Sequence, residues 1–413
     1  MAKKQTKKTD TTAHAENLEP AFAELQHTGD PVQFKIKHPS DTKLYDQVVK
    51  NLLQEVPKPR TPDNLVLTLE EVLGSEGKSM VNDITKSGKI IFHAVGDTGS
   101  TKGPKTEAEV IDKMVNDFGG DDHGNEPSFC FHLGDVVYSF GEGRYYYDQF
   151  YDPFRDYPAP ILAIPGNHDG LVYKGDNETS LEAFLRNFVT DSPELSQDSM
   201  GLRRTTVTQP GVYFALDAPF VTIIGLYSNV LEDPGIISSQ GGKYDKLNDD
   251  QLTFLTDQLK RVKDSGKAVL VAVHHPPYTG GSAHNPSPEL LNDLDTCCKN
   301  AGSWPHAFLS GHAHNYQRFT RTVGKFDVPY IVCGNSGHNV SRLTQKNNAP
   351  IRTPKKVSNE IIFENYDDKN YGYLRIIVDK DTLRIEYHDD NPDQKTDSDA
   401  VTVQLKDHTM ISN

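Results

Sequence analysis

The chain has 413 residues, of which 36% are hydrophobic, and its 43 basic and 58 acidic side chains give a formal net charge of −15. A chain of this size can bury a sizeable core, and its acidic balance argues against a nucleic-acid-binding surface, which needs a basic footprint. No run of about 18 or more apolar residues occurs, so we expect no transmembrane helix, and the four cysteines form no disulfide or zinc-binding pattern.

The N-terminal part of the chain carries no chemical motif. Residues 1–30 are polar and lysine-rich, which is typical of a disordered tail, and no apolar stretch follows that would make a secretory signal. The sequence leaves the location open and favours the cytoplasm only slightly. Apolar residues recur at helical spacing over 41–56, and short helices are expected at Leu67–Leu73 and Met80–Ile84. These features predict an N-terminal helical extension over 31–88.

From residue 89 the pattern changes to strands that alternate with helices. Buried strands are expected at Lys89–Val95, Ser128–Leu133, Pro160–Ile164, Ala268–Val273, Ala307–Leu309 and Val328–Val332. Helices are expected near Thr106–Phe118, Ser180–Val189 and Leu252–Val262, and hairpins around Asp217–Pro219 and over 371–388. This alternation predicts an α/β (α+β) domain with parallel strands over 89–390, followed by a C-terminal segment at 391–413.

Five short segments that each follow a predicted strand are rich in side chains that bind metals. They are Gly96-Asp97-Thr98-Gly99, Gly134-Asp135-Val136-Val137-Tyr138, Gly166-Asn167-His168-Asp169, Val271-Ala272-Val273-His274 and Gly311-His312-Ala313-His314. A single Gly-Asp turn or strand-end histidine is more often structural. Carboxylate, imidazole, phenolate and amide oxygen together, however, make a mixed-ligand site for iron, zinc or manganese, and open α/β sheets bind ligands at these strand ends.

The ordered set of segments resembles the calcineurin-like metallophosphoesterases and, more narrowly, the purple acid phosphatases. The marks of that subgroup are Asp-x-Gly, Gly-Asp-x-x-Tyr, Gly-Asn-His-Asp/Glu, Val-x-x-His and Gly-His-x-His, and all five occur here within about residues 90–335. Other calcineurin-like enzymes place a histidine where this chain has Gly99, and Tyr138 supplies the compensating ligand. The resemblance implies a four-layer sandwich of two mixed β-sheets flanked by helices.

The resemblance also implies a binuclear centre with Asp135 as the bridging ligand. Its protein ligands are Asp97, Asp135, Tyr138 and His314 for one metal, and Asp135, Asn167, His274 and His312 for the other. Because phenolate is a hard, anionic donor, we expect Fe(III) at the Tyr138 site and a divalent ion (Fe, Zn or Mn) at its neighbour. The expected reaction is hydrolysis of phosphate monoesters by a metal-bridging hydroxide. The alternative is hydrolysis of phosphodiesters, for example of nucleotides, by the same centre.

Three further residues are candidates for catalysis. His168 is expected to contact the phosphoryl group, with Asp169 orienting it. His284 lies in a loop rich in glycine and proline and is the candidate general acid, while His275 competes for that role. The expected partner is a small phosphorylated substrate, without a nucleic-acid or membrane surface.

The remaining histidines receive structural interpretations. His93 and His132 lie inside predicted strands and are expected to be core residues, and His338 could approach the pocket. A catalytically silent binding module with the same fold is the alternative from a different functional class, although the intact ligand set argues against it. The sequence leaves the natural substrate and the oligomeric state open.

Overall fold

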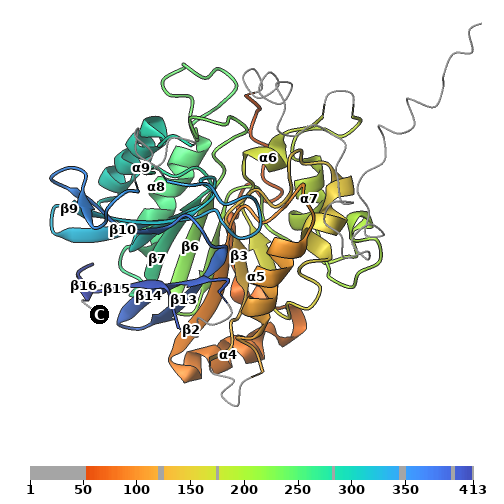
Figure 1. Ribbon diagram of the computed structural model, residues 1–413, viewed down its shortest axis with the longest axis horizontal. Coiled ribbons are helices and arrows are strands. Elements are labelled where there is room, and N and C mark those ends of the chain that lie inside the picture. Colours follow the sequence, from red (N-terminus) through yellow and green to blue (C-terminus); the bar gives the residue numbers. More distant parts are fainter. Residues whose placement is uncertain are drawn as a thin grey trace, which may run out of the picture.

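The computed structural model describes residues 53–119, 125–173, 176–280, 284–343, 350–391 and 396–411. Two mixed β-sheets pack face to face at the centre, and helices lie outside them (Figure 1). This is the four-layer α/β sandwich that the sequence predicted. The proposed tail at 1–30 and most of the amphipathic segment at 41–56 lie outside the described residues.

The larger sheet has nine strands and the smaller one has seven. The order in the larger sheet is β1 (Val66–Thr68), β5 (Phe214–Ala218), β6 (Val221–Leu226), β7 (Ala268–Val273), β8 (Ala307–Ser310), β10 (Phe326–Cys333), β9 (Tyr316–Val323), β12 (Ile361–Asp367) and β11 (Lys355–Lys356). The order in the smaller sheet is β16 (Met410–Ile411), β15 (Asp399–Gln404), β14 (Thr382–Asp389), β13 (Gly372–Asp379), β2 (Lys89–Val95), β3 (Cys130–His132) and β4 (Ile161–Ala163). Strands β6, β7, β8 and β10 run parallel, as do β2, β3 and β4.

The helices have clear local causes. They are α3 (Leu69–Val72), α4 (Gly77–Ser87), α5 (Lys105–Val115), α6 (Asn167–Gly170), α7 (Glu182–Phe188), α8 (Asp250–Val262) and α9 (Pro288–Ala301). In α9, the Ser287 hydroxyl accepts a hydrogen bond from the Leu290 amide, and Pro288 occupies the first helical position. The helix ends at Gly302, whose left-handed conformation suits glycine.

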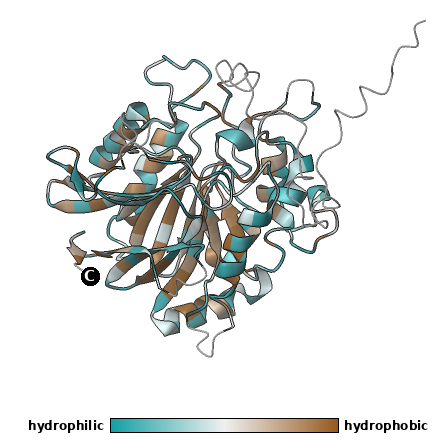
Figure 2. Cartoon of the chain, viewed as in Figure 1, coloured by the Kyte–Doolittle hydropathy of each residue, from teal (hydrophilic) through white to brown (hydrophobic). Residues whose placement is uncertain are grey.

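The central strands are buried on both faces, which explains their continuous apolar sequences. In β7, Leu270 faces the core between the sheets, whereas Val269 and Val271 belong to the core beneath the helices. Figure 2 shows these strands as mostly hydrophobic and the outer helices as largely hydrophilic. This packing fixes the strand ends that carry the candidate ligands.

Several elements differ from the sequence-based expectation. Residues Val66–Thr68 form strand β1 beside β5, inside the segment expected to be purely helical. The smaller sheet continues past residue 390, because β15 pairs with β14 and β16 pairs with β15. Strands β9 and β12 and helix α9 were not expected. Within the described ranges, no helix combines the length and apolar character that crossing a membrane requires.

Candidate metal centre

The predicted ligand segments come together where the two sheets meet. Asp97, Asp135 and Asn167 follow β2, β3 and β4 of the smaller sheet, and the three ligand histidines follow β7 and β8 of the larger sheet. The backbone amide of His312 donates to Asp97 Oδ2 over 2.7 Å, which ties the two sheets together at this point. The structure thus brings all seven predicted ligands into one buried cluster.

The first group of donors surrounds the Tyr138 hydroxyl. Tyr138 Oη lies 2.7 Å from Asp97 Oδ1, 2.9 Å from Asp135 Oδ2 and 3.2 Å from His314 Nε2. His314 Nε2 is also 3.5 Å from Asp97 Oδ1. These are the four residues that the sequence assigned to one metal.

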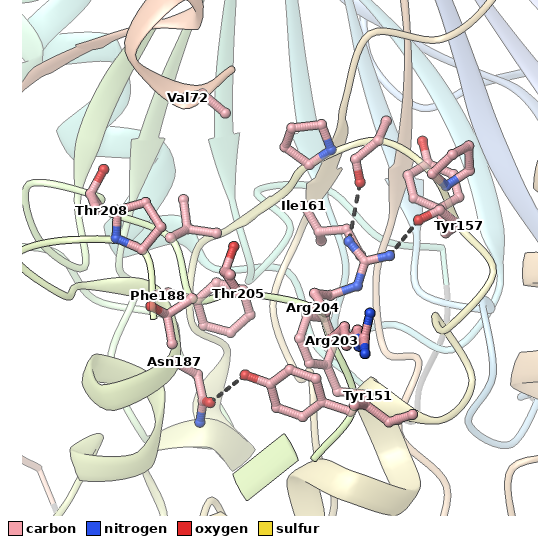
Figure 3. Close-up of a pocket in the computed structure, with 18 of the residues that line it drawn as sticks. Val72, Tyr151, Tyr157, Ile161, Asn187, Phe188, Arg203, Arg204, Thr205 and Thr208 are labelled. Carbon is pink, nitrogen blue, oxygen red and sulfur yellow. Dashed lines mark hydrogen bonds between the residues drawn. The ribbon is translucent and has the colours of Figure 1, made fainter. Parts of the chain in front are cut away.

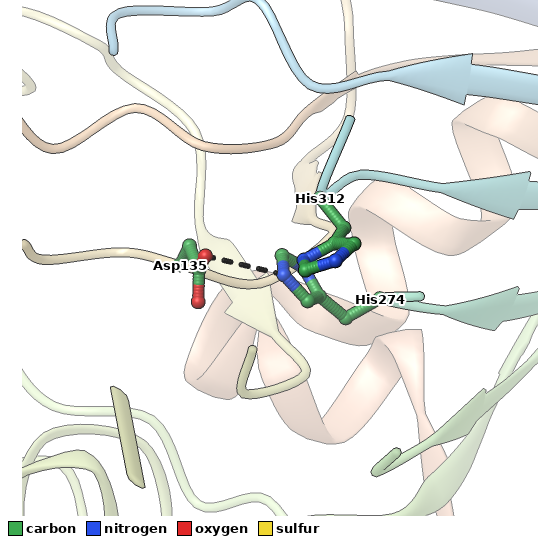
Figure 4. A group of neighbouring side chains, drawn as sticks. All are labelled: Asp135, His274 and His312. Atoms are coloured by element: carbon green, nitrogen blue, oxygen red, sulfur yellow. Dashed lines mark ion pairs between the residues drawn. The ribbon is translucent and has the colours of Figure 1, made fainter. Parts of the chain in front are cut away.

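The second group of donors surrounds the Asn167 side-chain oxygen. His274 Nε2 and His312 Nδ1 each lie 3.1 Å from Asn167 Oδ1. His274 Nε2 is also 3.2 Å from Asp135 Oδ2, the carboxylate oxygen that contacts Tyr138 (Figure 4). Asp135 therefore belongs to both groups, in the position of a bridging ligand.

The spacing of the donors fits metal coordination. Metal bonds to oxygen and nitrogen are about 2.0–2.2 Å long, so ligands at right angles around one ion lie about 3 Å apart. The donor separations within each group are close to this value. In addition, His274 donates its Nδ1–H to the Leu133 carbonyl over 2.9 Å, so its Nε2 would be the nitrogen that binds a metal.

Burial acts against the anionic form of the three acidic donors. Burial raises the pKa of Tyr138 well above its usual value, and the neighbouring carboxylates add to this. Burial also raises the pKa of Asp97 to about 7, with a contribution from Asp135. Although burial opposes it, the charge of His274 lowers the pKa of Asp135. A bound cation would favour the anionic form of all three groups.

The two histidines of the Gly-His-x-His segment are suited to bind metal. Burial, together with the charges of neighbouring histidines, lowers the pKa of both His312 and His314 well below the usual value. Both imidazoles are therefore neutral, which is the form that coordinates metals.

Three of the ligands have strained backbones. The φ angles of Asp97, Asp135 and His312 are 55°, 55° and 66°, in the left-handed region that residues other than glycine rarely adopt. The position before Asn167 also requires glycine, because a Cβ on Gly166 would lie 2.1 Å from Asp135 Oδ1. Strain held by the surrounding fold is typical of functional sites.

The segment that carries Tyr138 packs closely against Gly99. A Cβ on Gly99 would lie 2.6 Å from Gln149 Oε1 and 2.8 Å from the Val136 carbonyl oxygen. A histidine at position 99 would therefore displace the segment that carries Tyr138. The phenol and a histidine at position 99 are alternatives in this site.

The support of His168 differs from the expectation. The Asp169 carboxylate accepts hydrogen bonds from the backbone amides of Gly166 and Val136, at 2.8 and 3.0 Å. The Ser139 carbonyl accepts a hydrogen bond from His168 Nδ1–H over 2.9 Å. Asp169 thus holds the ligand loops in place, and a backbone carbonyl orients His168.

The structure separates the two candidates for the general acid. His284 lies over both donor groups, with its ring centroid 4.4 Å from that of His312 and 4.8 Å from that of His314. In contrast, His275 Nδ1 is 2.8 Å from Ser228 Oγ, and its Nε2 is 2.8 Å from the Leu231 carbonyl. Both nitrogens of His275 are therefore used in structural hydrogen bonds.

Glu232 is a site residue that the sequence did not reveal. Its Oε1 lies 3.4 Å from His284 Nδ1, and its Oε2 accepts from Asn167 Nδ2 over 3.4 Å. Although burial opposes it, the neighbouring Glu232 carboxylate raises the pKa of His284. No motif marks Glu232, because its position depends on the path of the loop after β6.

His338 also contacts the centre. Its ring stacks on Tyr138 with centroids 3.7 Å apart, and the ring of His168 lies 4.2 Å from that of Tyr138. His338 Nδ1 lies 3.0 Å from the Gly99 carbonyl oxygen. His93 and His132 are fully buried, as expected of core residues.

A separate pocket of about 410 Å³ lies near the start of β4 (Figure 3). Arg204 is at its centre and donates to the carbonyls of Ala159 and Tyr157, and the Tyr151 hydroxyl donates to Asn187. None of the predicted site residues lines this pocket. Its arginine holds the turn before β4 in place.

A two-sheet sandwich with clustered metal-ligand side chains at its strand ends is the arrangement of a metal-dependent hydrolase. Residues 91–316, more than half of the chain, match the model of the calcineurin-like phosphoesterase family. The chain belongs to this family, whose members are dimetal phosphoesterases. A search of curated proteins finds no match.

Solved structures with a similar fold include an enzyme and an anchor protein. A purple acid phosphatase from yellow lupin (Lupinus luteus) seeds has a TM-score of 0.52 and 15% identity over 76% of this chain. The match covers 54% of the lupin chain, so this chain spans about half the length of that relative. GAP50, the anchor in the inner membrane complex of Plasmodium, has a TM-score of 0.50 and 14% identity, covering 74% of this chain and 86% of that chain. At these identities the similarity concerns the fold.

Proposed function

We propose that the protein is an acid-phosphatase-type hydrolase of small phosphate monoesters, with Fe(III) at the Tyr138 site and a divalent ion beside it. The observation that carries the proposal is the position of Asp135 Oδ2, 2.9 Å from Tyr138 Oη and 3.2 Å from His274 Nε2. One carboxylate oxygen shared by two donor groups is the arrangement that holds a metal pair. When bound, the two ions supply a hydroxide nucleophile and neutralise phosphoryl charge.

The protein's own residues then position the substrate and move protons. His168 donates its Nδ1–H to the Ser139 carbonyl, and as an imidazolium it would present Nε2–H as a donor to a phosphoryl oxygen. His284 is held by Glu232 through Nδ1, so its Nε2–H is available to protonate the leaving alkoxide. Tilted and edge-on packing against the rings of Tyr138 and His312 limits the movement of these two imidazoles.

Phosphodiester hydrolysis is the alternative activity, because loops rather than the metal centre choose between the substrates. The test compares kcat/KM for an aryl phosphate monoester and a bis-aryl phosphate diester, with and without a chelator. We expect chelator-sensitive turnover that favours the monoester. A preference for the diester would contradict the monoesterase proposal and leave the metal centre in place.

The role of His284 gives a prediction that depends on the leaving group. In His284→Ala, we expect kcat for an alkyl phosphate to fall roughly 100-fold, whereas kcat for a nitrophenyl phosphate falls much less. An alkoxide needs protonation to depart, but a nitrophenolate is already a good leaving group. His275→Ala serves as the matched control and should not distinguish the two substrates. Equal losses on both substrates in His284→Ala would exclude a general-acid role.

A further inference from the structure

A second groove, of about 700 Å³, opens at the end of the central strands opposite to the metal ligands. It is bordered by the segments that precede β7 and β8, by the β9–β10 and β13–β14 turns, and by the turn that follows β15. We call it the basal groove. Five lysines line it: Lys263, Lys267, Lys325, Lys380 and Lys406.

The basal groove is basic although the chain is acidic. Only two carboxylates, Asp264 and Asp381, are among its lining residues, whereas the whole chain carries a net charge of −15. Lys267 pairs with Asp217 at 2.9 Å, and Lys380 lies 3.8 Å from Asp381. The other three lysines form no ion pair with any described residue, so their charges can attract an anion.

Helix ends account for only part of this charge. Lys263 lies near Gly302 at the C-terminal end of α9, where a cation offsets the helix dipole. Lys260 and Lys299 lie in the last turns of α8 and α9 and do not line the groove. Lys325 and Lys406 lie on turns between strands, so no helix end explains them.

A buried imidazole supplies a directional donor in the groove. His408 is 9% exposed, and its ring stacks on His306 with centroids 4.0 Å apart. Both nitrogens of His306 are used, because Nδ1 accepts from the Val269 amide and Nε2 donates to the Leu405 carbonyl. His408 Nδ1, in contrast, has no hydrogen-bond partner among the described groups. A buried polar nitrogen normally has one.

The backbone of His408 has an uncommon conformation that fixes the position of its ring. Its φ angle of 56° lies in the left-handed region, which residues other than glycine adopt uncommonly. Two hydrogen bonds hold the turn, from the His408 amide to the Gln404 carbonyl and from the Asp327 amide to the His408 carbonyl. The turn thereby keeps the imidazole in the groove wall.

We propose that the basal groove binds an anion that carries several phosphate groups, on a soluble molecule or a lipid headgroup. The lysine ammonium groups pair with the phosphate oxygens, and His408 Nδ1–H donates to one of them. The volume and the three lysines without ion pairs suit several phosphates rather than one carboxylate. This site is separate from the metal centre, since Trp304 precedes β8 and His312 follows it, and the four residues of this strand alone span roughly 13 Å at ~3.3 Å per residue.

The single tryptophan of the chain makes the proposal testable, because Trp304 lines the groove. We would titrate the full chain with methylenediphosphonate, which phosphatases do not hydrolyse, and with phosphatidylcholine vesicles with and without phosphatidylinositol bisphosphate. A saturable change in Trp304 fluorescence is expected with at least one phosphate probe. The probe that produces it identifies a soluble or a lipid source.

Charge-matched double variants distinguish a site from general attraction. Lys325→Glu/Lys406→Glu should weaken probe binding about tenfold or more, whereas Lys260→Glu/Lys299→Glu should weaken it about twofold or less. His408→Leu should also weaken binding, and His408→Asn, which tolerates the left-handed backbone and keeps a donor, should restore part of it.

Two results would overturn the proposal. One is the absence of a saturable change with either probe, and the other is equal weakening by the two lysine pairs. If a His408 variant does not fold, the lysine pairs decide the question. Monoester turnover, measured in the same samples, reports on the metal centre separately, so loss of either function is recognised independently of the other.

Discussion

Asp135→Ala is expected to lose both metal ions and to lower turnover roughly 1000-fold or more, since a loss of ~4 kcal/mol of transition-state stabilisation has that effect. The reason is geometric. Asp135 Oδ2 contacts Tyr138 in one donor group and His274 in the other, so one substitution removes a ligand from each metal. Elemental analysis of the purified variant, together with turnover of an aryl phosphate, measures both consequences.

Two controls make this result specific. Asn167→Ala should mainly weaken the second metal, because Asn167 Oδ1 contacts only the His274 and His312 donors of the cluster. Asp295→Ala removes another buried carboxylate, the partner of Arg321 at 2.6 Å, and should reduce stability while the metals remain. If Asp135→Ala keeps two ions per chain, the bridging assignment is wrong.

Tyr138→Phe is expected to abolish the visible absorption of the iron-loaded protein. We attribute that band to charge transfer from the phenolate to Fe(III), and phenylalanine lacks the donor oxygen. The phenylalanine ring should keep its place, because His338 stacks on the ring of Tyr138 with centroids 3.7 Å apart. The substitution removes only the contacts of the Tyr138 hydroxyl with Asp97, Asp135 and His314. An absorption spectrum read against the iron content is the measurement.

A matched tyrosine provides the control for this spectrum. Tyr316 is also buried and stacked, and its hydroxyl donates to Asp399 over 2.8 Å, away from the donor cluster. Tyr316→Phe should therefore keep the band unchanged. Colour that persists in Tyr138→Phe at unchanged iron content would exclude the phenolate ligand.

The clustering of the candidate ligand segments could be predicted because they follow buried strands, whereas the assignment of the seven ligands came from the resemblance to the purple acid phosphatases. Parallel strands bring their carboxyl ends to one edge of a sheet, so the positions of Asp97, Asp135 and His274 depended only on recognising those strands. Glu232 and Ser139 could not be predicted, because their approach to His284 and His168 depends on how long loops fold back.

The same reasoning explains which strands were missed. β9 contains Arg318 and Arg321, whose ion pairs with Asp399 and Asp295 are tertiary contacts that local sequence does not show. β1 has only three residues and is a strand because β5 offers it a partner. β15 is half-buried and pairs with β14, so its pattern is weaker than that of the central strands.

The proposed function requires a binuclear metal centre that hydrolyses phosphate esters. The most direct test is the metal content of the purified full chain by elemental analysis, measured before and after chelation together with turnover of an aryl phosphate monoester. We expect two ions per chain, one of them iron, and turnover that disappears on chelation and returns when the metals are restored. A well-folded protein that takes up no metal and turns over no ester would contradict this expectation and indicate a binding module built on the same fold.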